Sequence, residues 1–243
     1  MRIVAIIPAR YGSQRFPGKP LVHIGGKPMI QRVFERARQS PKLDAIYVAT
    51  DDKRIEACVK GFGGKAIMTS SRHASGTDRI FEAVKILGLD REDLVVNIQG
   101  DQPLFPPSLV ADLIGPFEEE RTLAMSTLAQ PLSSLQEALS PNQVKVVVDK
   151  EGRALYFSRY PIPYYRDGGE QPWYLKHIGV YAYKVWFLEE FSGLPQGTLE
   201  KAERLEQLRA LENGYRVKVV ITTLGSPEVD VPEDVARVEK ALS

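Results

Sequence analysis

The sequence predicts an α/β fold built on a mostly parallel sheet, and three observations lead to that prediction. Short β-branched runs in the first half are almost wholly apolar, as strands buried on both faces are. Amphipathic helical stretches separate these runs, and the spacing of strand, helix and strand suits right-handed crossovers. The 243 residues are enough for one large α/β domain or at most two small ones.

The first half supplies the parallel strands. Four runs are strand candidates: IVAII (3–7), AIYVAT (45–50), KAIMT (65–69) and LVVNIQ (94–99). Helices are expected between them at about 28–39, 52–61 and 77–87. The first of these begins at Pro28, which suits the first turn of a helix, and its apolar residues share one stripe.

The second half has a different pattern. VKVVVDKEGRALYFS (144–158) predicts a hairpin, and the Pro-, Gly- and Tyr-rich stretch 160–174 predicts a long functional loop. KHIGVYAYK (176–184) alternates as a strand does, with His177 and Tyr181 on one face. A helix is expected from about Thr198 to Glu212, then a strand at 216–222 and a helix at 232–242. One compact domain with an antiparallel elaboration is favoured over two domains.

Composition narrows the class of protein. The formal net charge is +1, from 32 basic and 31 acidic side chains, which argues against a nucleic-acid partner and favours local cationic clusters for small anions. The single cysteine, Cys58, excludes an internal disulfide and fits a reducing compartment. No leader pattern and no apolar run of about 18 residues is present, so we expect a cytoplasmic protein without a membrane partner.

The loop PARYGSQRFPGKP (8–20), after the first strand, is close to a P-loop but is not one. Five residues separate Gly12 from Gly18, and Lys19 is followed by Pro20, which has no hydroxyl for magnesium. The loop nonetheless carries Ser13 and three cations, Arg10, Arg15 and Lys19. Three cations beyond the carboxyl end of a parallel strand suit a triphosphate, although a solvated basic loop is the plainer alternative.

Two aspartates are candidate metal ligands. Asp101 in VNIQGDQP follows an apolar strand, and Asp230 in PEVDVPED precedes the last helix. Magnesium takes one or two carboxylates together with phosphate oxygens and waters, so such a pair would suit it. Each aspartate taken alone is more often a turn or cap residue.

Other polar groups leave alternatives open. In HASGTDR (73–79), Ser75 and Gly76 could expose amides to a nucleobase or ribose, and a plain helix cap is compatible with that role. His177 and Tyr181 could line a polar pocket or form an ordinary half-buried sheet face. The remaining candidates are as consistent with surface positions: Glu206 and Gln207 beside a leucine stripe, and His23 and His73 without an evident partner.

Taken together, these stretches resemble the 3-deoxy-manno-octulosonate cytidylyltransferases (CMP-Kdo synthetases) from about residue 3 to 242. The matching pieces are IIPARYGSQRFPGKPL, ATD (49–51), SGTDR, VNIQGDQP, VKVVVDKEGRALYFSRYPIPY, KHIGVYAYK, LEQLRALENG and VDVPEDV. The first loop alone is shared in variants by related sugar nucleotidyltransferases. The whole set in this order is specific, above all ALYFSR with KHIGVYAY and LEQLR.

The resemblance implies a nucleotide-diphospho-sugar transferase (Rossmann-like) fold and a reaction. The family is usually dimeric and joins CTP to Kdo with Mg²⁺, giving CMP-Kdo for lipopolysaccharide biosynthesis and pyrophosphate. It implies a single domain over 1–243, with a nucleotide-binding part at about 1–130 and 215–243 and a sugar-binding and dimerisation part at about 131–214.

Site residues follow from the same resemblance. The catalytic set it implies is Arg10, Arg15, Lys19, Asp101 and Asp230, of which Asp101 and Asp230 hold the metal. The nucleotide-binding set is Arg10, Ser13, Arg15, Lys19, Ser75, Gly76, Arg79, Gln99 and Asp101. The set that would contact the acidic sugar is Arg159, His177, Tyr181, Glu206 and Gln207.

The chain departs from the family pattern at two positions beside the implied metal ligands. The family usually has Glu at the position of Gln102, and Thr at the position of Val231. The amide removes a negative charge beside Asp101, and valine cannot cap the last helix, which would leave that task to Asp230.

Four other functions compete with the implied one. Cytidylyl transfer to another acidic sugar, a sialic acid or 8-amino-Kdo, needs only a changed pocket contact. A catalytically silent nucleotide-binding or dimerisation module is disfavoured by the intact Lys19, Asp101 and Asp230. A dinucleotide-dependent dehydrogenase is disfavoured because no G-x-G-x-x-G follows the first strand, and Pro20 disfavours a P-loop kinase.

Overall fold

The computed structural model describes residues 1–12, 16–73, 75–166 and 173–242, which group into two compact units. The first unit comprises Met1–Ala111, Tyr183–Ser192 and Gly225–Ser243, and the second comprises Asp112–Ala182 and Gly193–Leu224. The chain therefore leaves the first unit, builds most of the second and returns twice. The prediction of one domain with a nucleotide part and a sugar part stays a prediction.

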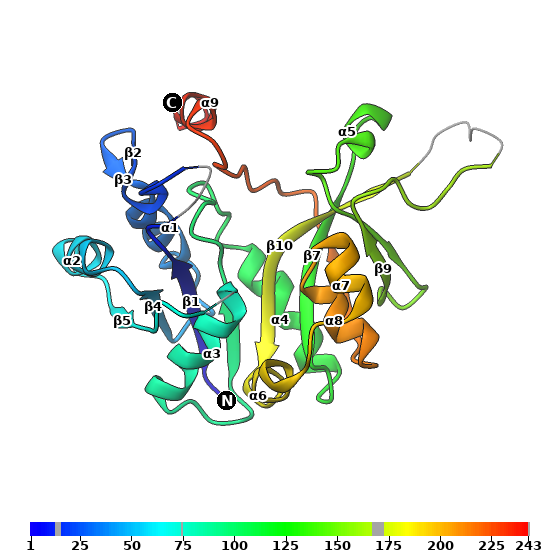
Figure 1. The fold of residues 1–243 in the computed structure, drawn as a ribbon, viewed down its shortest axis with the longest axis horizontal. Helices are drawn as coiled ribbons and strands as arrows, with labels where there is room; N and C mark the ends of the chain where they lie inside the picture. The colour runs from blue at the N-terminus through cyan, green and yellow to red at the C-terminus, as the bar shows by residue number, and fades with distance from the viewer. Residues whose placement is uncertain (13–15, 74, 167–172, 243) are drawn as a thin grey trace. The chain divides into compact units, whose positions relative to one another are not determined.

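The first unit contains the predicted parallel sheet (Figure 1), in the order β6-β1-β4-β5. Its strands are β1 (Ile3–Ala9), β4 (Ala45–Thr50), β5 (Ala66–Met68) and β6 (Leu94–Asn97). Strand β6 is buried along its whole length, and β1 is buried at five of its seven residues, as their apolar sequences predict.

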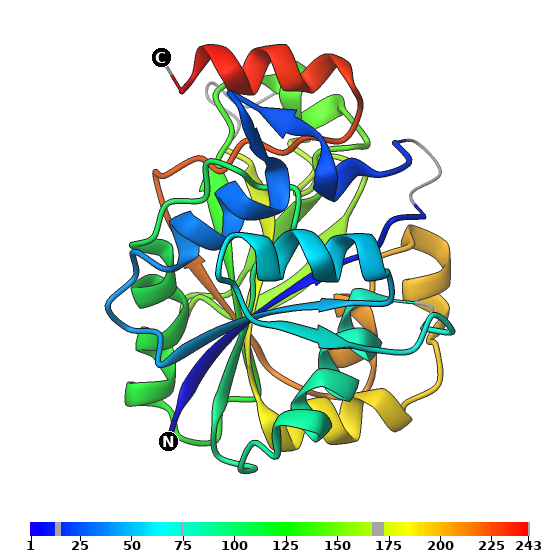
Figure 2. The same cartoon turned by 90° about the vertical axis from the view of Figure 1, so that its left-hand side faces the viewer.

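Helices cover both faces of these strands. They are α1 (Met29–Ala37), α2 (Lys53–Gly61) and α3 (Gly76–Leu87). Figure 2 shows α1 and α2 on one side of β1 and β4, and α3 on the other. Side-chain caps fix two of the starts, because Asp52 accepts from the Arg54 amide and Ser75 from the Asp78 amide.

The end of the chain returns to the first unit. Helix α6 (Val185–Gly193) lies almost wholly in it, and α9 (Glu233–Lys240) closes it, next to the short β2–β3 hairpin (His23–Ile24 and Lys27–Pro28). Ile24, Met29, Val229 and Val238 form a buried apolar cluster that joins this hairpin to α9. Apolar contact, and not strand pairing, therefore attaches the last helix.

The second unit holds the antiparallel elaboration. Its strands are β7 (Met125–Pro131), β8 (Lys145–Val148), β9 (Ala154–Ser158), β10 (Leu175–Lys184, through residue 182) and β11 (Val217–Ile221). Strand β7 pairs in parallel with β11, whereas β8 pairs antiparallel with both β9 and β10. The predicted hairpin at 144–158 is confirmed, with its turn closed by a 2.9 Å bond from the Asp149 amide to the Arg153 carbonyl.

The helix expected from Thr198 to Glu212 was a wrong prediction. The structure has two short helices there, α7 (Thr198–Glu203) and α8 (Gln207–Glu212), separated at Arg204, which takes a left-handed φ of 53°. A buried ion pair joins the two helices, since the Arg209 guanidinium donates to both carboxylate oxygens of Glu200 at 2.6 and 2.7 Å. The leucine periodicity predicted the buried face of this region correctly, but it does not indicate the break at Arg204.

Two longer elements had no prediction. Helix α4 (Leu109–Glu119) contains Gly115 and Pro116, which are poor helix residues, and β7 carries Ser126, Thr127 and Gln130 among its apolar residues. Helix α5 (Leu135–Leu139) is a single short turn begun by Ser134. No helix among the residues described is long and apolar enough to cross a membrane.

Candidate active site

A cavity of about 270 Å³ opens in the first unit beyond the carboxyl ends of the parallel strands. Its lining comes from the loop after β1, the start of α3, the loop after β6 and the segment before α9. The lining residues are Pro8, Ala9, Arg10, Lys19, Pro20, His73, Ser75, Gly76, Arg79, Gln99, Gly100, Asp101 and Asp230. Ligands bind at this edge of open α/β sheets.

The loop after β1 brings its cations to the cavity. The chain turns back at Gly18, whose amide donates to the Tyr11 carbonyl at 2.9 Å, and a short 3₁₀ turn, η1 (Lys19–Leu21), follows. Gly18 has a φ of 74°, and the Tyr11 ring lies 3.2 Å from where a Cβ would be, so a larger residue would be strained and crowded. Arg10 is exposed on the cavity wall, whereas Ser13 and Arg15 lie outside the described residues.

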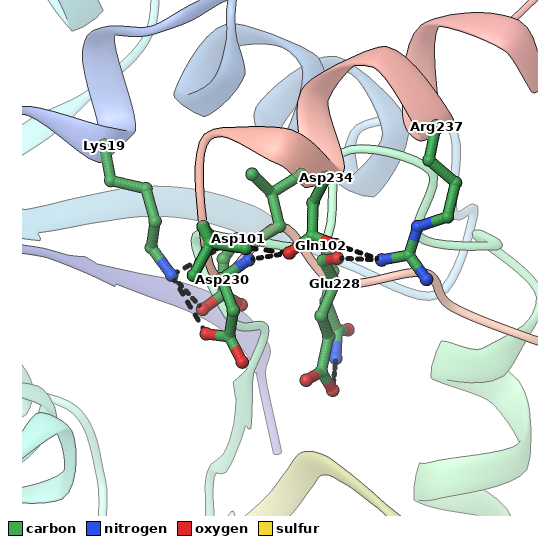
Figure 3. A network of polar contacts seen from close by, with 9 residues as sticks. Lys19, Asp101, Gln102, Glu228, Asp230, Asp234 and Arg237 are labelled. Carbon is green, nitrogen blue, oxygen red and sulfur yellow. Dashed lines mark hydrogen bonds and ion pairs between the residues drawn. The ribbon is translucent and has the colours of Figure 1, made fainter. Parts of the chain in front are cut away.

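Lys19 joins three distant segments of the chain (Figure 3). Its ammonium donates to Asp101 Oδ2 at 2.7 Å and to the Val229 carbonyl at 3.0 Å, and it lies 3.6 Å from Asp230 Oδ1. The lysine side chain is only 15% exposed. Partial burial reduces solvent screening, so these charges interact more strongly than a surface pair.

The same geometry tests the predicted metal ligands. Asp101 and Asp230, which are 129 positions apart in the sequence, face one cation, so their carboxylates already form a cation site. Two hard oxygen ligands suit Mg²⁺, which takes its other ligands from phosphates and water. No group of three or more His, Cys, Asp or Glu side chains suited to a metal occurs in the described residues.

Asp234 resolves the question raised by Val231. Its Oδ2 accepts from the backbone amides of Asp230 at 2.8 Å and Val231 at 3.1 Å, at the start of α9. These two amides precede the helix, whose N-cap residue Pro232 makes no side-chain capping bond, so Asp234 fixes the segment that carries Asp230. The carboxylate of Asp230 remains directed at Lys19.

The start of α3 forms another part of the cavity wall. Ser75 caps the helix through its bond with the Asp78 amide at 3.1 Å, and a side chain at Gly76 would lie 3.6 Å from Pro8 Cγ. Arg79 is buried, and its guanidinium donates to Thr69 Oγ1 at 2.6 Å and to Asp51 Oδ2 at 2.7 Å. Its position is thus fixed by the protein itself.

His73 was missed by the sequence analysis, which left it without a partner. It lines the cavity, and its Nε2 hydrogen-bonds to the carboxylate of Glu82. Burial raises the pKa of Glu82, but hydrogen bonds from His73 and from the Ser70 amide outweigh burial and lower the pKa overall. The sequence feature that could have indicated a site role for His73 is its position just before the SGTDR motif.

In the second unit, Arg159 is held by backbone carbonyls. Its guanidinium donates to the carbonyl oxygens of Glu203 at 2.7 Å, Pro141 at 3.0 Å and Arg204 at 3.4 Å. Glu206 and Gln207 lie at the start of α8, directly after the break at Arg204. Gln207 is buried and Glu206 is half-buried, so the alternative of fully solvated surface positions does not hold for either, and their contact with the sugar stays a prediction.

His177 lies in an aromatic cluster and not on a polar face. It is 7% exposed, with Phe157 edge-on at 5.0 Å and Tyr181 at 5.4 Å between ring centroids. Its Nε2 lies 2.9 Å from Thr127 Oγ1, whose hydroxyl donates to the Val180 carbonyl at 2.8 Å, so Nε2 carries the proton. Burial lowers the pKa of His177 to about 3, which keeps the ring neutral.

The structure thus brings the predicted nucleotide and metal residues that it describes to one cavity of an α/β unit: Arg10, Lys19, Ser75, Gly76, Arg79, Gln99, Asp101 and Asp230. It describes the predicted sugar residues within the second unit. A loop with cationic side chains and a carboxylate pair beyond parallel strands are the features that a nucleotidyltransferase site requires.

Comparison with known proteins identifies the family. A cytidylyltransferase family model matches residues 4–220. The chain is 54% identical over 242 residues to a 3-deoxy-manno-octulosonate cytidylyltransferase of Desulfatibacillum aliphaticivorans, covering 100% of this chain and 99% of that one. It is also 54% identical over 244 residues to an 8-amino-3,8-dideoxy-manno-octulosonate cytidylyltransferase of Shewanella sediminis, with the same coverage.

Solved structures agree. A CMP:2-keto-3-deoxy-manno-octonic acid synthetase complexed with CTP superposes with a TM-score of 0.94 at 44% identity, covering 100% of this chain and 98% of that one. A 4-diphosphocytidyl-2C-methyl-D-erythritol synthase shares the fold, with a TM-score of 0.66 at 16% identity and full coverage of both chains. The chain therefore belongs to the cytidylyltransferases, and among them to the CMP-Kdo synthetase family. The predicted fold is confirmed.

The low pKa of His177 predicts how stability depends on pH. The folded-state value of about 3 lies below the ordinary 6.5, so below about pH 6.5 the unfolded chain binds a proton that the folded chain does not. The contribution of the neutral, buried His177 to the free energy of unfolding is therefore full above about pH 6.5 and is lost as the pH falls toward 3. Relative to His177→Gln, wild-type stability should fall about 1.4 kcal/mol more per pH unit between about pH 4 and 6.

Urea unfolding of both proteins across that range measures the difference. His23 and His73 remain in both, so their titration cancels in the comparison. Parallel pH profiles for wild type and variant would show that His177 is not buried neutral.

Proposed function

We propose that this cytidylyltransferase transfers CMP from CTP to the anomeric hydroxyl of Kdo and releases pyrophosphate. The observation that carries the proposal is the convergence of Lys19, Asp101 and Asp230 on one cavity. In a transfer of this kind the hydroxyl oxygen bonds to the α-phosphorus, its proton leaves, and the bond from the α-phosphorus to pyrophosphate breaks. No covalent intermediate with the protein is needed.

The residues of the first unit act by position and charge. Arg10, Arg15 and Lys19 bind the triphosphate and neutralise the charge that builds on departing pyrophosphate. Asp101 and Asp230 hold Mg²⁺, which when bound neutralises phosphate charge and lowers the pKa of the attacking hydroxyl. Lys19 already holds the two carboxylates in place before substrate arrives.

The nucleoside is proposed to lie against Ser75, Gly76, Arg79 and Gln99. Gly76 supports this because it has no side chain where the wall of the cavity faces Pro8. Arg79 has its charge matched by Asp51, so it suits recognition of a neutral base or ribose better than binding of a phosphate.

The sugar is proposed to bind in the second unit at Arg159, His177, Tyr181, Glu206 and Gln207. Arg159 supports this because, among the described residues, it donates to neutral carbonyls and forms no ion pair, so its charge is available to the sugar's carboxylate. Because its Nε2–H is taken by Thr127 Oγ1, a neutral His177 leaves Nδ1 as an acceptor for a hydroxyl group. We also place the reaction in the cytoplasm, consistent with a single cysteine.

The sugar is tested by a substrate panel, because relatives named for Kdo and for 8-amino-Kdo are equally similar to this chain. We expect pyrophosphate release from CTP with Mg²⁺ and Kdo, and a lower kcat/KM with 8-amino-Kdo and with a sialic acid. Purified protein and one coupled assay serve for all three sugars. A higher kcat/KM with 8-amino-Kdo would replace Kdo by the amino sugar, and release with sialic acid alone would overturn both.

The metal assignment is tested by Asp101→Ala and Asp230→Ala. Each should lower metal-dependent turnover by at least about a hundredfold, because a lost ligand removes several kcal/mol of charge stabilisation. Asp90→Ala is the matched control, since Asp90 is an exposed carboxylate of the same unit. Turnover near the wild-type rate in either variant, measured across Mg²⁺ concentrations, would refute the assignment.

A homodimer is proposed from apolar surface on the second unit. Leu155, Tyr160, Tyr164 and Trp173 are 61, 75, 83 and 50% exposed, and large aromatic side chains are enriched at protein interfaces. Sedimentation should give twice the 27.2 kDa chain mass, and Leu155→Ser with Tyr164→Ser should shift the protein toward monomer. A wild-type protein that sediments as a monomer at all concentrations tested would contradict the dimer.

A further inference from the structure

Gln102 is a fully buried polar side chain next to a proposed metal ligand. It follows Asp101 directly and is 0% exposed. Its amide makes two hydrogen bonds to the segment before Asp230. Nε2 donates to Glu228 Oε1 at 3.2 Å, and Oε1 accepts from Ser226 Oγ at 3.1 Å. The nitrogen and the oxygen of the Gln102 amide thus both link two segments that are more than 120 positions apart.

Further bonds make this link continuous with both aspartates (Figure 3). The Val229 amide donates to the Asp101 carbonyl at 2.9 Å, between Glu228 and Asp230 in the sequence. Arg237 donates to the Glu228 carbonyl at 3.0 Å and to Asp234 Oδ1 at 2.8 Å, which ties the segment to α9. Val229 itself is fully buried in the apolar cluster beneath. A shift at Gln102 would therefore be passed to both carboxylates.

We propose that Gln102 and Glu228 are positioning residues whose amide–carboxylate hydrogen bond sets the spacing of Asp101 and Asp230. This inference rests on the proposed function, because it takes these two aspartates to be the metal ligands. Neither Gln102 nor Glu228 needs to touch metal or nucleotide. Residues that orient metal ligands in this way affect metal affinity by about 10- to 100-fold when replaced.

The pattern of donors and acceptors explains why the residue at 102 is an amide. Ser226 donates to Gln102, and Gln102 donates to Glu228, so each group has the partner that it requires. A carboxylate at 102 has no hydrogen to give to Glu228 and would face it with like charge at a buried position, which is costly. Exchanging the two residue types keeps one amide and one carboxylate and restores a donor for the acceptor.

A mutant cycle tests this directly, with Gln102→Glu, Glu228→Gln and the double variant. The readout is Mn²⁺ binding in the presence of CTP, followed by electron paramagnetic resonance, alongside kcat and the KM for CTP. Gln102→Glu should weaken Mn²⁺ binding about tenfold or more. The double variant should recover to within about threefold of wild type, since the two effects are coupled. Glu228→Gln alone, which still offers an acceptor to Gln102, should change binding little.

Two controls separate positioning from folding. Gln39→Glu makes the same charge change at an exposed residue of the first unit and should leave Mn²⁺ binding unchanged. Thermal unfolding of each variant gives the folded fraction, and a purely structural loss would lower kcat without moving the Mn²⁺ half-saturation. If Gln102→Glu does not fold, recovery of Mn²⁺ binding in the double variant still tests the pair.

The outcomes are distinguishable. Wild-type Mn²⁺ affinity in Gln102→Glu, or a double variant that binds no better than Gln102→Glu, would overturn the positioning role and leave the proposed function standing. A wild-type protein that binds no Mn²⁺ with CTP would overturn the metal assignment, and the positioning role with it.

Discussion

The ammonium of Lys19 is the constraint on which the candidate active site depends. It lies against Asp101 and Asp230, which are 129 positions apart in the chain, and donates to the Val229 carbonyl. Two partly buried carboxylates side by side repel each other, and a cation between them removes that cost. The loop after β1 therefore has a structural role, and Pro20 lies in the 3₁₀ turn from which Lys19 reaches the two carboxylates.

That constraint holds only because the segment carrying Asp230 is itself fixed. Asp234 caps its amides, Arg237 binds the Glu228 carbonyl, and Val229 is buried with Ile24 and Val238. The hydrogen bonds orient the segment that carries Asp230, and the apolar cluster keeps that segment rigid. A ligand pair assembled from distant segments needs both, because an error of about 1 Å in a site of this kind already weakens it.

Sequence reasoning succeeded where one local signal decided the outcome. The parallel strands of the first unit follow from apolar runs, and the β8–β9 hairpin follows from its turn at Asp149. It failed where tertiary contacts override the local signal. The break at Arg204 costs helical bonds that the buried Glu200–Arg209 pair offsets, and neither is visible from a leucine stripe. His177 alternates like a solvent-facing residue, yet β10 is buried on both faces.

Arg79 and Arg159 are both arginines in predicted binding sets, and the structure shows that their surroundings differ. Arg79 is buried and its charge is matched by Asp51, so this arginine already has an ion-pair partner within the protein. Arg159 is equally well fixed but by carbonyl oxygens, which satisfy its hydrogens without cancelling its charge. The Glu203 carboxylate lies beside it, accepting from the Arg159 backbone amide at 2.9 Å, and buried Lys145 donates to the Arg159 and Ser140 carbonyls. A fixed guanidinium that forms no ion pair among the described residues suits a carboxylate ligand, because the ligand can bind without displacing an internal ion-pair partner.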